Sequence, residues 1–294
     1  MNGILLIDKD KGMTSHDVVN RVRRILGTRK VGHTGTLDPI ATGLLPVLIG
    51  EATKISNYIV ADDKEYIGTA VFGNEYTTYD ITGDVLAKTD NIPSDEEVIK
   101  YIEALKGKIT QKPPIYSAIK VKGKKLYEYA RAGIEVEIPE REVEIFETEV
   151  LNNMPGEVCF RVKCSSGTYI RSLIQSMGRD LSSYAAMSDL RRTKVGVFNI
   201  EDAISLDDLE KLSREEIEAR LISIEEALSN MKKFIVPDYF YDRMKNGLQF
   251  RMKKTDFNIG EEVRIYCKGE FIGIGYIRMK DTPELQLKKL IIGG

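Results

Sequence analysis

The chain has 294 residues, of which 42% are hydrophobic and 30% charged, and its formal net charge is −2. These values are typical of a globular protein with one large domain and a small one, and they exclude a uniformly basic nucleic-acid binder. The N-terminal apolar run is too short for a signal peptide and no segment has transmembrane length, so we expect a cytoplasmic protein whose three cysteines are reduced. The two histidines, His16 and His33, have no cysteine at metal-binding spacing, which argues against a zinc site.

The N-terminal segment predicts a short strand and then a helix with a basic face. Ile4–Ile7 is an apolar run of strand length, and Ser15 is a suitable N-cap for a helix that ends near Leu26, before Gly27. The apolar stripe of this helix contains Val18, Val19, Val22, Ile25 and Leu26. Its arginines fall largely off the stripe, and residues 1–60 carry eight Lys or Arg against five Asp or Glu.

Residues 32–43 form a glycine-rich loop that presents a single carboxylate. Glycine permits tight turns and the close approach of a ligand, and Pro39 biases the preceding Asp38 toward an extended backbone. Asp38, with His33 five residues upstream, is therefore a candidate reactive acid, and the alternative is an ordinary Asp-Pro turn. The spacing does not match the Walker A phosphate-binding motif. An apolar run, Leu44–Ile49, follows the loop.

Residues 66–131 predict a strand, a helix and an exposed arm. Tyr66–Phe72 has strand character, and the capping box formed by Ser94 and Glu97 starts a helix that Gly107 is expected to end. Prolines, lysines and tyrosines alternate over residues 112–131, and residues 110–131 carry six Lys or Arg against one Asp or Glu. This pattern is typical of a mobile arm that binds phosphates and stacked bases, and equally of a plain surface hairpin and helix.

A half-buried strand and a helix follow, and the helix carries a charged candidate. Apolar and polar residues alternate over Val158–Cys164, and residues 165–168 open the helix. Its inward face is expected to contain Ile170, Leu173, Ile174, Met177 and Leu181. Arg171 lies in the first turn, where a cation opposes the helix dipole at a cost of about 1 kcal/mol or less. A carboxylate or phosphate partner would remove this conflict, and the alternative is an arginine exposed to water.

The remaining residues predict an acidic helical linker and a small β domain. Residues 201–226 carry three Lys or Arg against ten Asp or Glu, a balance typical of solvated helix faces. A strand-rich zone begins near Phe234, and Val263, Ile265 and Cys267 alternate with polar or charged residues. We therefore expect a compact β domain after the linker.

Several of these pieces, in this order, resemble the TruB family of tRNA pseudouridine synthases, which modify uridine 55 in the tRNA T-loop. The matching segments are residues 3–9 with 12–15, the loop 32–43, and residues 64–66, 116–118, 123–131, 167–171 and 190–192. The glycine-rich loop and the Gly-Thr-Tyr-Ile-Arg segment at 167–171 are together highly specific. The resemblance covers nearly all of residues 1–200. Asp10 stands where many relatives have proline, which affects the shape of a turn and leaves the chemistry intact.

The resemblance implies an α+β chain with two domains. Residues 1–230 are expected to form the pseudouridine-synthase catalytic domain, with a central mixed or antiparallel β-sheet flanked by helices and an inserted tRNA-gripping arm at about 110–140. Residues 231–294 resemble, on weaker evidence, a small β-rich PUA-like RNA-binding domain.

The resemblance also implies roles for individual residues. Asp38 is the expected catalytic aspartate, Arg171 its partner, and Tyr66 the residue that packs against the target base. Supporting residues near the active site are Lys9, Lys64 and Leu190. The residues expected to bind tRNA are His33, Lys120, Lys122, Lys124, Lys125, Arg131, Arg191 and Arg192. Without the resemblance, Tyr66 is better interpreted as a core strand tyrosine and His33 as a loop histidine with its hydrogen bonds satisfied.

The implied reaction converts uridine to pseudouridine by breaking the bond between C1′ and N1, joining C5 to C1′ and releasing a proton from C5. It needs no ATP, redox cofactor or metal. The aspartate attacks C1′, acts as a base that starts glycal formation, or attacks C6, and the sequence does not choose among these. Each route needs an ionised carboxylate, which a guanidinium partner favours. The implied partner is the T-stem-loop of tRNA, bound by a monomer without a membrane or an obligatory protein partner.

Two other functions stay open at this point. One is an RNA-binding or tRNA-folding module whose isomerase chemistry is secondary or absent, and the other is a related synthase with a different RNA target. The presence of Asp38, Tyr66 and Arg171 in their matching motifs favours the tRNA-modifying enzyme, and tRNA-folding activity is compatible with it.

Overall fold

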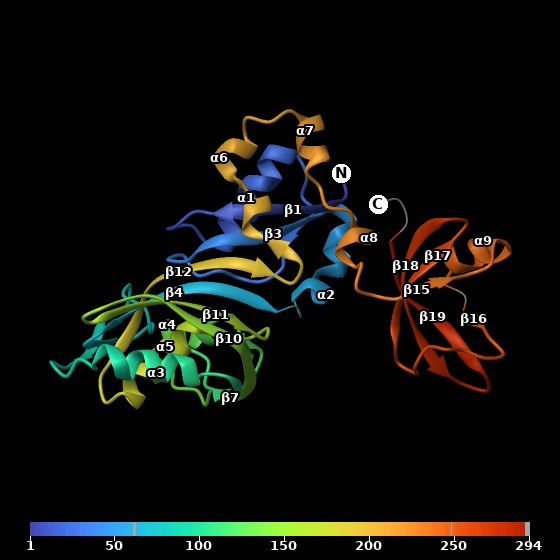
Figure 1. Cartoon of the computed structure of the whole chain (residues 1–294). Helices are drawn as coiled ribbons and strands as arrows, with labels where there is room; N and C mark the ends of the chain where they lie inside the picture. The colour runs from blue at the N-terminus through green and yellow to red at the C-terminus, as the bar shows by residue number, and fades with distance from the viewer. Residues whose placement is uncertain (61–62, 248, 292–294) are drawn as a thin grey trace.

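The computed structural model describes residues 1–60, 63–247 and 249–291 (Figure 1). Its main feature is a mixed ten-stranded sheet in the order β14-β1-β3-β12-β4-β11-β10-β7, with β13 beside β12 and β2 beside β3. The strands of this sheet are β1 (Gly3–Lys9), β2 (Val31–His33), β3 (Thr42–Ile49), β4 (Lys64–Phe72), β7 (Gly107–Gln111), β10 (Arg141–Met154), β11 (Glu157–Cys164), β12 (Ala185–Val195), β13 (Phe198–Asn199) and β14 (Ile204–Ser205).

In the described ranges, two further hairpins and twelve helical segments accompany the strands of this sheet and those of a smaller C-terminal sheet. The hairpins pair β5 (Asn74–Tyr76) with β6 (Val85–Lys88), and β8 (Lys120–Val121) with β9 (Lys124–Lys125). The helical segments are η1 (Gly50–Ile55), η2 (Ile200–Asp202), η3 (Asp238–Phe240), α1 (Ser15–Leu26), α2 (Ser56–Val60), α3 (Asp95–Ala104), α4 (Leu126–Arg131), α5 (Ile170–Asp180), α6 (Leu206–Leu209), α7 (Arg214–Ala219), α8 (Ile224–Ala227) and α9 (Tyr241–Lys245). No helix in the described ranges is long and apolar enough to cross a membrane.

Strands β1 and β3 are buried on both faces, because the alternation of side chains sends their apolar residues into two different cores. Leu5 and Ile7 pack in one core with the apolar stripe of α1, whereas Ile4 and Leu6 pack in a second core with residues of η1 and α2. Strands β4 and β11 instead alternate buried and partly exposed residues, which for β11 confirms the predicted half-buried strand. In Figure 1, α1, α6 and α7 gather on the β1 side of the sheet, and α3 and α5 lie near β10 and β11.

The predicted first helix is present over Ser15–Leu26, but its N-cap is Thr14 and not Ser15. The Thr14 hydroxyl accepts a hydrogen bond from the Asp17 N–H, and the Asp17 carboxylate accepts one from the Thr14 N–H, which completes a capping box. Ser15 is free for another role because Thr14 satisfies the helix end. Its buried hydroxyl donates to the Leu37 carbonyl at 3.1 Å and accepts from the Leu37 N–H at 2.8 Å.

The C-terminal residues form a separate five-stranded sheet that lies beside the main body (Figure 1). Its strands, in the order β15-β17-β18-β19-β16, are β15 (Lys233–Ile235), β16 (Phe250–Arg251), β17 (Glu262–Cys267), β18 (Glu270–Met279) and β19 (Pro283–Leu290). Ile274 and Ile291 of this unit are buried in the same cluster as Ile55 and Ile59 of the main body. The unit is therefore joined to the main body by apolar packing as well as by the chain.

In β17 the alternation of apolar and polar residues predicts that Arg264 is exposed to solvent, but it is buried. It is only 6% exposed, and its guanidinium donates to the backbone carbonyls of Glu225, Ser229 and Met231. These three carbonyls belong to the segment that contains α8 and leads into β15. Arg264 thus holds the linker against the C-terminal sheet, an arrangement that period-two reasoning does not reveal.

The glycine-rich loop returns to the sheet at Gly43, where β3 begins to run parallel to β12. Gly43 pairs with Arg192 in this register and has a φ of +99°. A Cβ added at Gly43 would lie 2.3 Å from the Arg192 carbonyl oxygen. Only glycine therefore permits this close approach of the two backbones, which fixes the end of the loop that carries Asp38.

We expect Gly43→Ala to destabilise the fold by clearly more than Gly27→Ala. Gly27 also has a positive φ, but a Cβ there meets nothing within 4 Å, so its substitution should cost only the left-handed backbone penalty of roughly 1–2 kcal/mol. Urea-induced unfolding of the two variants measures the difference. Equal losses would show that the β3–β12 approach does not require a glycine.

Candidate active site

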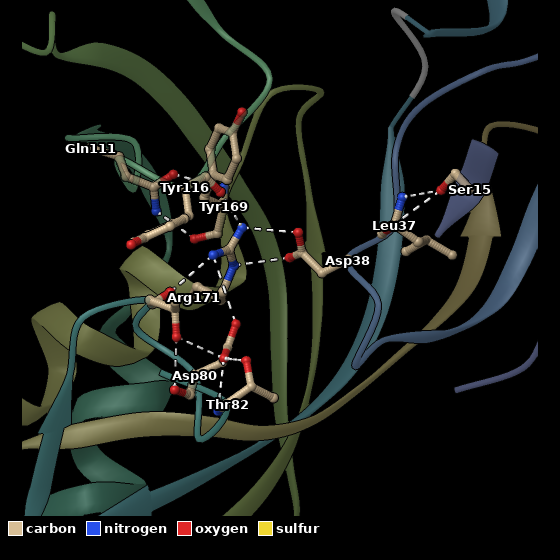
Figure 2. Close-up of polar contacts among 10 residues, drawn as sticks. Ser15, Leu37, Asp38, Asp80, Thr82, Gln111, Tyr116, Tyr169 and Arg171 are labelled. Carbon is tan, nitrogen blue, oxygen red and sulfur yellow. Dashed lines mark hydrogen bonds and ion pairs between the residues drawn. The ribbon is translucent and has the colours of Figure 1, made fainter. Parts of the chain in front are cut away.

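The side chains of Asp38 and Arg171, which lie 133 residues apart in the chain, form an ion pair (Figure 2). Arg171 Nη2 donates to Asp38 Oδ1 at 2.9 Å, and Arg171 Nε lies 2.9 Å from Oδ2 without the angle of a second hydrogen bond. The Arg171 side chain is 4% exposed and that of Asp38 is 32% exposed. A buried guanidinium at the start of α5 therefore has the carboxylate partner that the helix dipole argument called for.

Arg171 is surrounded by further acceptors that hold its guanidinium in place. Nη1 donates to the Thr78 carbonyl at 2.9 Å, and Nη2 also donates to the Tyr116 carbonyl at 3.0 Å. A second carboxylate, Asp80, lies 3.8 Å from Nη1, with a side chain that is 6% exposed. Arg171 thus lies between two acids, and it presents one edge of its guanidinium to Asp38 (Figure 2).

Asp80 is a site residue that sequence reasoning missed. Its position suggested only a turn, because Gly83 follows it closely and no motif marks it. In the structure its carboxylate accepts hydrogen bonds from the Thr78 hydroxyl and the Thr82 N–H at 2.8 and 3.0 Å. Tyr79 just before it has a positive φ of 64°, and the Met187 N–H donates to the Tyr79 carbonyl. The turn is therefore held against β12, which brings Asp80 to Arg171.

The backbone around Asp38 is held on both sides. Ser15 binds both polar groups of the Leu37 backbone, one residue before Asp38 (Figure 2). On the other side, the Gly12 N–H donates to the Pro39 carbonyl at 2.7 Å. The glycine-rich loop is therefore fixed by the segment between β1 and α1, which positions the carboxylate before any ligand arrives.

A cavity of about 280 Å³ opens beside the Asp38–Arg171 pair. Its wall combines an aromatic ring, apolar side chains and a few polar groups, which suits a flat heterocycle held by stacking and hydrogen bonds. The residues that line it include Asp38, Lys64, Tyr66, Ser117, Tyr169 and Leu190. The expected active-site residues Tyr66, Lys64 and Leu190 are 7%, 7% and 5% exposed, so each contributes to the floor or wall of the cavity.

Electrostatics at the cavity floor are set by burial and by the surrounding charges. Burial raises the pKa of Asp38, Arg171 opposes that rise, and the nearby Asp80 carboxylate adds to it. Because 32% of the Asp38 side chain is open to solvent and the guanidinium lies at 2.9 Å, we expect the carboxylate to be ionised near neutral pH.

Burial lowers the pKa of Lys9 to about 8, although the negative charge of Asp38 acts to raise it. Lys9 donates to the carbonyls of Asp10 and Met13 and is fully buried.

Among the residues expected to bind tRNA, Arg192 needs correction. It is 1% exposed, its Nε donates to the Leu44 carbonyl at 2.7 Å, and its Nη2 donates to the Gly35 carbonyl at 3.3 Å. This guanidinium binds backbone carbonyls of the glycine-rich loop and of the strand that follows it, and it lines the cavity beside Asp38 instead of lying on the outer surface. Alternation along β12 explains the difference, because the preceding Arg191 points to the other face and is 39% exposed, paired with Asp8 at 2.7 Å.

His33 is partly buried on β2, and its Nδ1 accepts a hydrogen bond from the Gly35 N–H at 3.2 Å. Burial and the charge of Arg192 lower its pKa, which keeps the imidazole neutral at physiological pH. His33 therefore offers hydrogen bonding or stacking to a ligand in preference to a positive charge.

The arm predicted as either a mobile gripping segment or a surface hairpin and helix consists of the β8–β9 hairpin and α4. Lys120, Lys122 and Lys124 are exposed, as is Arg131, whereas Lys125 is partly buried. The guanidinium of Arg131 and the amine of Lys125 lie 5.5 and 5.3 Å from the ring centroid of Tyr127. The arm is thus a folded unit whose basic side chains are offered to solvent.

The base of the arm is fastened to the N-terminus of α5. Gln111 donates to the Tyr169 carbonyl at 2.9 Å and accepts from the Tyr169 N–H at 2.7 Å (Figure 2). The Ser172 hydroxyl donates to the Lys112 carbonyl. Together with the bond from Arg171 to Tyr116, these contacts fix residues 111–117 across the cavity. Within the described residues, no group of three or more His, Cys, Asp or Glu side chains is placed to hold a metal ion.

Comparison with known proteins relates this arrangement to one family. The model of the TruB family pseudouridylate synthase N-terminal domain matches residues 23–170, and the model of the tRNA pseudouridylate synthase B C-terminal domain matches residues 171–231. A tRNA pseudouridine synthase B of Geobacillus kaustophilus is 46% identical over 86% of this chain and 92% of its own length. That of Alkaliphilus oremlandii is 42% identical over 99% of this chain and 98% of its own length.

Solved structures give the same fold. A Cbf5–Nop10–Gar1 complex contains a chain that is 27% identical to this one, with a TM-score of 0.76 over 99% of this chain and 85% of that chain. An H/ACA ribonucleoprotein bound to a substrate RNA containing 2′-deoxyuridine contains another at 25% identity, with a TM-score of 0.74 and the same coverage.

We expect Arg171→Gln to raise the pKa of Asp38 further. Arg171 lowers that pKa in the folded protein, so loss of its charge leaves burial and Asp80 to act unopposed, and the carboxylate ionises only at higher pH. The ¹³C chemical shift of the Asp38 carboxyl, followed through a pH titration, measures the change. Arg179→Gln, on the same helix but paired with Glu75, is the matched control and should leave the titration unmoved. An Asp38 pKa that is unchanged in Arg171→Gln would contradict the electrostatic role of the pair.

Proposed function

Since the chain belongs to the TruB family and is a tRNA pseudouridine synthase, we propose that it acts on the uridine at position 55 of the tRNA T-loop, with Asp38 as the catalytic carboxylate. The observation that carries this assignment is the ion pair between Asp38 and Arg171 at the floor of a cavity lined by Tyr66 and Leu190. The alignment with tRNA pseudouridine synthase B over nearly the whole chain supports the choice of tRNA as the substrate.

The geometry suits an isomerisation in which an ionised carboxylate acts beside the glycosidic bond. The C1′–N1 bond breaks, the freed uracil turns, C5 bonds to C1′, and the C5 proton passes to solvent while N1 gains one. Arg171 keeps Asp38 ionised and fixes the direction of its oxygens, because Nη2 and Nε both face the carboxylate. The geometry is compatible with attack on C1′, with proton abstraction that starts glycal formation, and with attack on C6.

The cavity requires a nucleotide that has left its base stack. Only an extruded base can bring C1′ to a carboxylate at the cavity floor, and Tyr66 then replaces the lost stacking, worth roughly 1–3 kcal/mol per base. Leu190 supplies an apolar surface on the wall. Extrusion costs a few kcal/mol, and contacts to the flanking RNA have to offset it.

Those contacts are assigned to the basic side chains around the cavity. The exposed lysines of the β8–β9 hairpin and Arg131 would bind phosphates, Arg191 would add a partly exposed charge, and neutral His33 would contact the loop nucleotides. Residues 231–294 would bind a more distant part of the tRNA. We propose further that the enzyme works in the cytoplasm, as a monomer and without an obligatory protein partner.

Asp38→Asn should abolish the release of tritium from tRNA labelled at uridine C5. The substitution keeps the shape of the side chain but removes the charge that every proposed route needs. Asp189→Asn is the matched control, because Asp189 is an exposed partner of Lys11 and does not line the cavity. Tritium release by Asp38→Asn at the wild-type rate would overturn the assignment of Asp38, and label retained at position 55 in wild-type reactions would overturn the target position.

The double variant Lys122→Ala/Lys124→Ala should weaken T-stem-loop binding and lower its dependence on salt. Each phosphate contact contributes about one unit to the slope of log Kd against log salt concentration, so the slope should fall by about 2. Filter binding over a range of potassium chloride concentrations measures both quantities. Lys106→Ala, an exposed lysine outside the arm, is the control. An unchanged slope in the double variant would show that the arm does not contact phosphates.

A further inference from the structure

One buried polar group in the cavity is not used by the mechanism described above. Ser117 is 6% exposed, and its Oγ has no hydrogen-bond partner among the described residues. A buried hydroxyl without a partner is destabilising, because it has left water and gained nothing in return. Most buried polar side chains in native proteins are hydrogen-bonded, so an exception in a ligand cavity indicates a partner that arrives with the ligand.

The nearest hydroxyl group does not satisfy Ser117. Burial raises the pKa of Tyr169, and a side-chain interaction between its hydroxyl and Ser117 Oγ reduces this rise, so the two hydroxyls lie near each other. The contact lacks the geometry of a hydrogen bond at Ser117 Oγ. Both residues line the cavity, so the two hydroxyls face the same space.

The backbone of Ser117 is fixed, which limits the positions that its hydroxyl can occupy to the side-chain rotamers at this point of the cavity wall. The preceding carbonyl, that of Tyr116, accepts a hydrogen bond from Arg171 Nη2 at 3.0 Å, and the Ser117 carbonyl accepts one from the Tyr127 N–H at 3.2 Å. The same Nη2 donates to Asp38. Arg171 Nη2 therefore binds both the backbone next to Ser117 and the Asp38 carboxylate, so the two residues are held at a fixed distance from each other.

Thr34 shows why the cavity matters to this argument. Its Oγ1 is also buried without a partner, but Thr34 is fully enclosed and does not line the cavity, so no ligand can reach it. Among the described serine and threonine residues, only Ser117 has a buried hydroxyl without a hydrogen-bond partner and also lines the cavity.

We propose that Ser117 Oγ forms a hydrogen bond with the extruded uridine and is a binding and specificity residue of this enzyme. The proposal rests on the proposed function, which places the target uridine in this cavity. A serine hydroxyl both donates and accepts, so it can pair with a uracil carbonyl, with N3–H or with a ribose hydroxyl. Contact with the nucleotide supplies the partner that Ser117 lacks in the free protein.

The test compares Ser117→Ala with the parent in an Asp38→Asn background, where binding is measured without turnover. The probes are three T-stem-loop RNAs that carry uridine, 2′-deoxyuridine or an abasic nucleotide at the target position. We expect Ser117→Ala to weaken binding of the uridine RNA by about 3- to 10-fold, the effect of one hydrogen bond. Ser183→Ala removes another buried hydroxyl, which donates to the Tyr184 carbonyl outside the cavity, and should not change binding.

The other two RNAs identify the atom. If Ser117 contacts the base, its substitution no longer matters with the abasic RNA; if it contacts the 2′-hydroxyl, its substitution no longer matters with the 2′-deoxyuridine RNA. Either pattern supports the proposal. Equal weakening with all three RNAs, or no weakening with the uridine RNA, overturns it. Tritium release by the wild-type enzyme from the same T-stem-loop tests the proposed function separately, because that result does not depend on Ser117.

Discussion

The ion pair between Asp38 and Arg171 is the interaction on which the organisation of the site depends. Arg171 is 4% exposed, and a guanidinium buried to this degree is tolerated only with charged and polar partners on several sides. Two carboxylates and two backbone carbonyls supply them, from the glycine-rich loop, the turn at Asp80 and the base of the arm. Removal of either acid would leave Arg171 with a single carboxylate partner. Burial of Arg171 costs free energy, but the buried guanidinium also fixes the orientation of the Asp38 carboxylate and favours its ionised form.

Three segments that are remote in sequence meet at this one guanidinium, and each is held independently by the rest of the fold. Ser15 holds Leu37 before Asp38, β12 holds the turn that contains Asp80, and Gln111 holds the N-terminus of α5. Because Arg171 Nη2 serves both Asp38 and the Tyr116 carbonyl, a movement of the arm base would disturb the carboxylate directly. The geometry therefore ties the position of the arm base to the position of the Asp38 carboxylate.

The two-sided burial of β1 and β3 explains how this site is kept rigid beside a second domain. One face of these strands packs on α1, whose N-terminus positions the glycine-rich loop, and the other face packs on η1 and α2, which also contact Ile274 and Ile291 of the C-terminal sheet. Arg264 adds hydrogen bonds to the linker. The C-terminal unit is thereby joined to the strands that flank the glycine-rich loop.

The sequence by itself determined the local elements and the principal reactive groups. Capping residues marked the helix that starts after Ser94, alternation marked β11, and the loop with Asp38 and the helix start with Arg171 carried the resemblance to a family. Tertiary structure decided which polar side chains work inside the protein: Thr14 and not Ser15 caps α1, Arg192 is buried, and Asp80 and Ser117 belong to the site. Apart from the local cap at Thr14, these choices depend on contacts between residues remote in sequence, from 22 positions for Ser15 with the Leu37 carbonyl to 157 for Arg192 with the Gly35 carbonyl. The spacing of apolar residues in the sequence indicates which face of a helix or strand a residue occupies. Only the tertiary structure determines which other residues it contacts on that face.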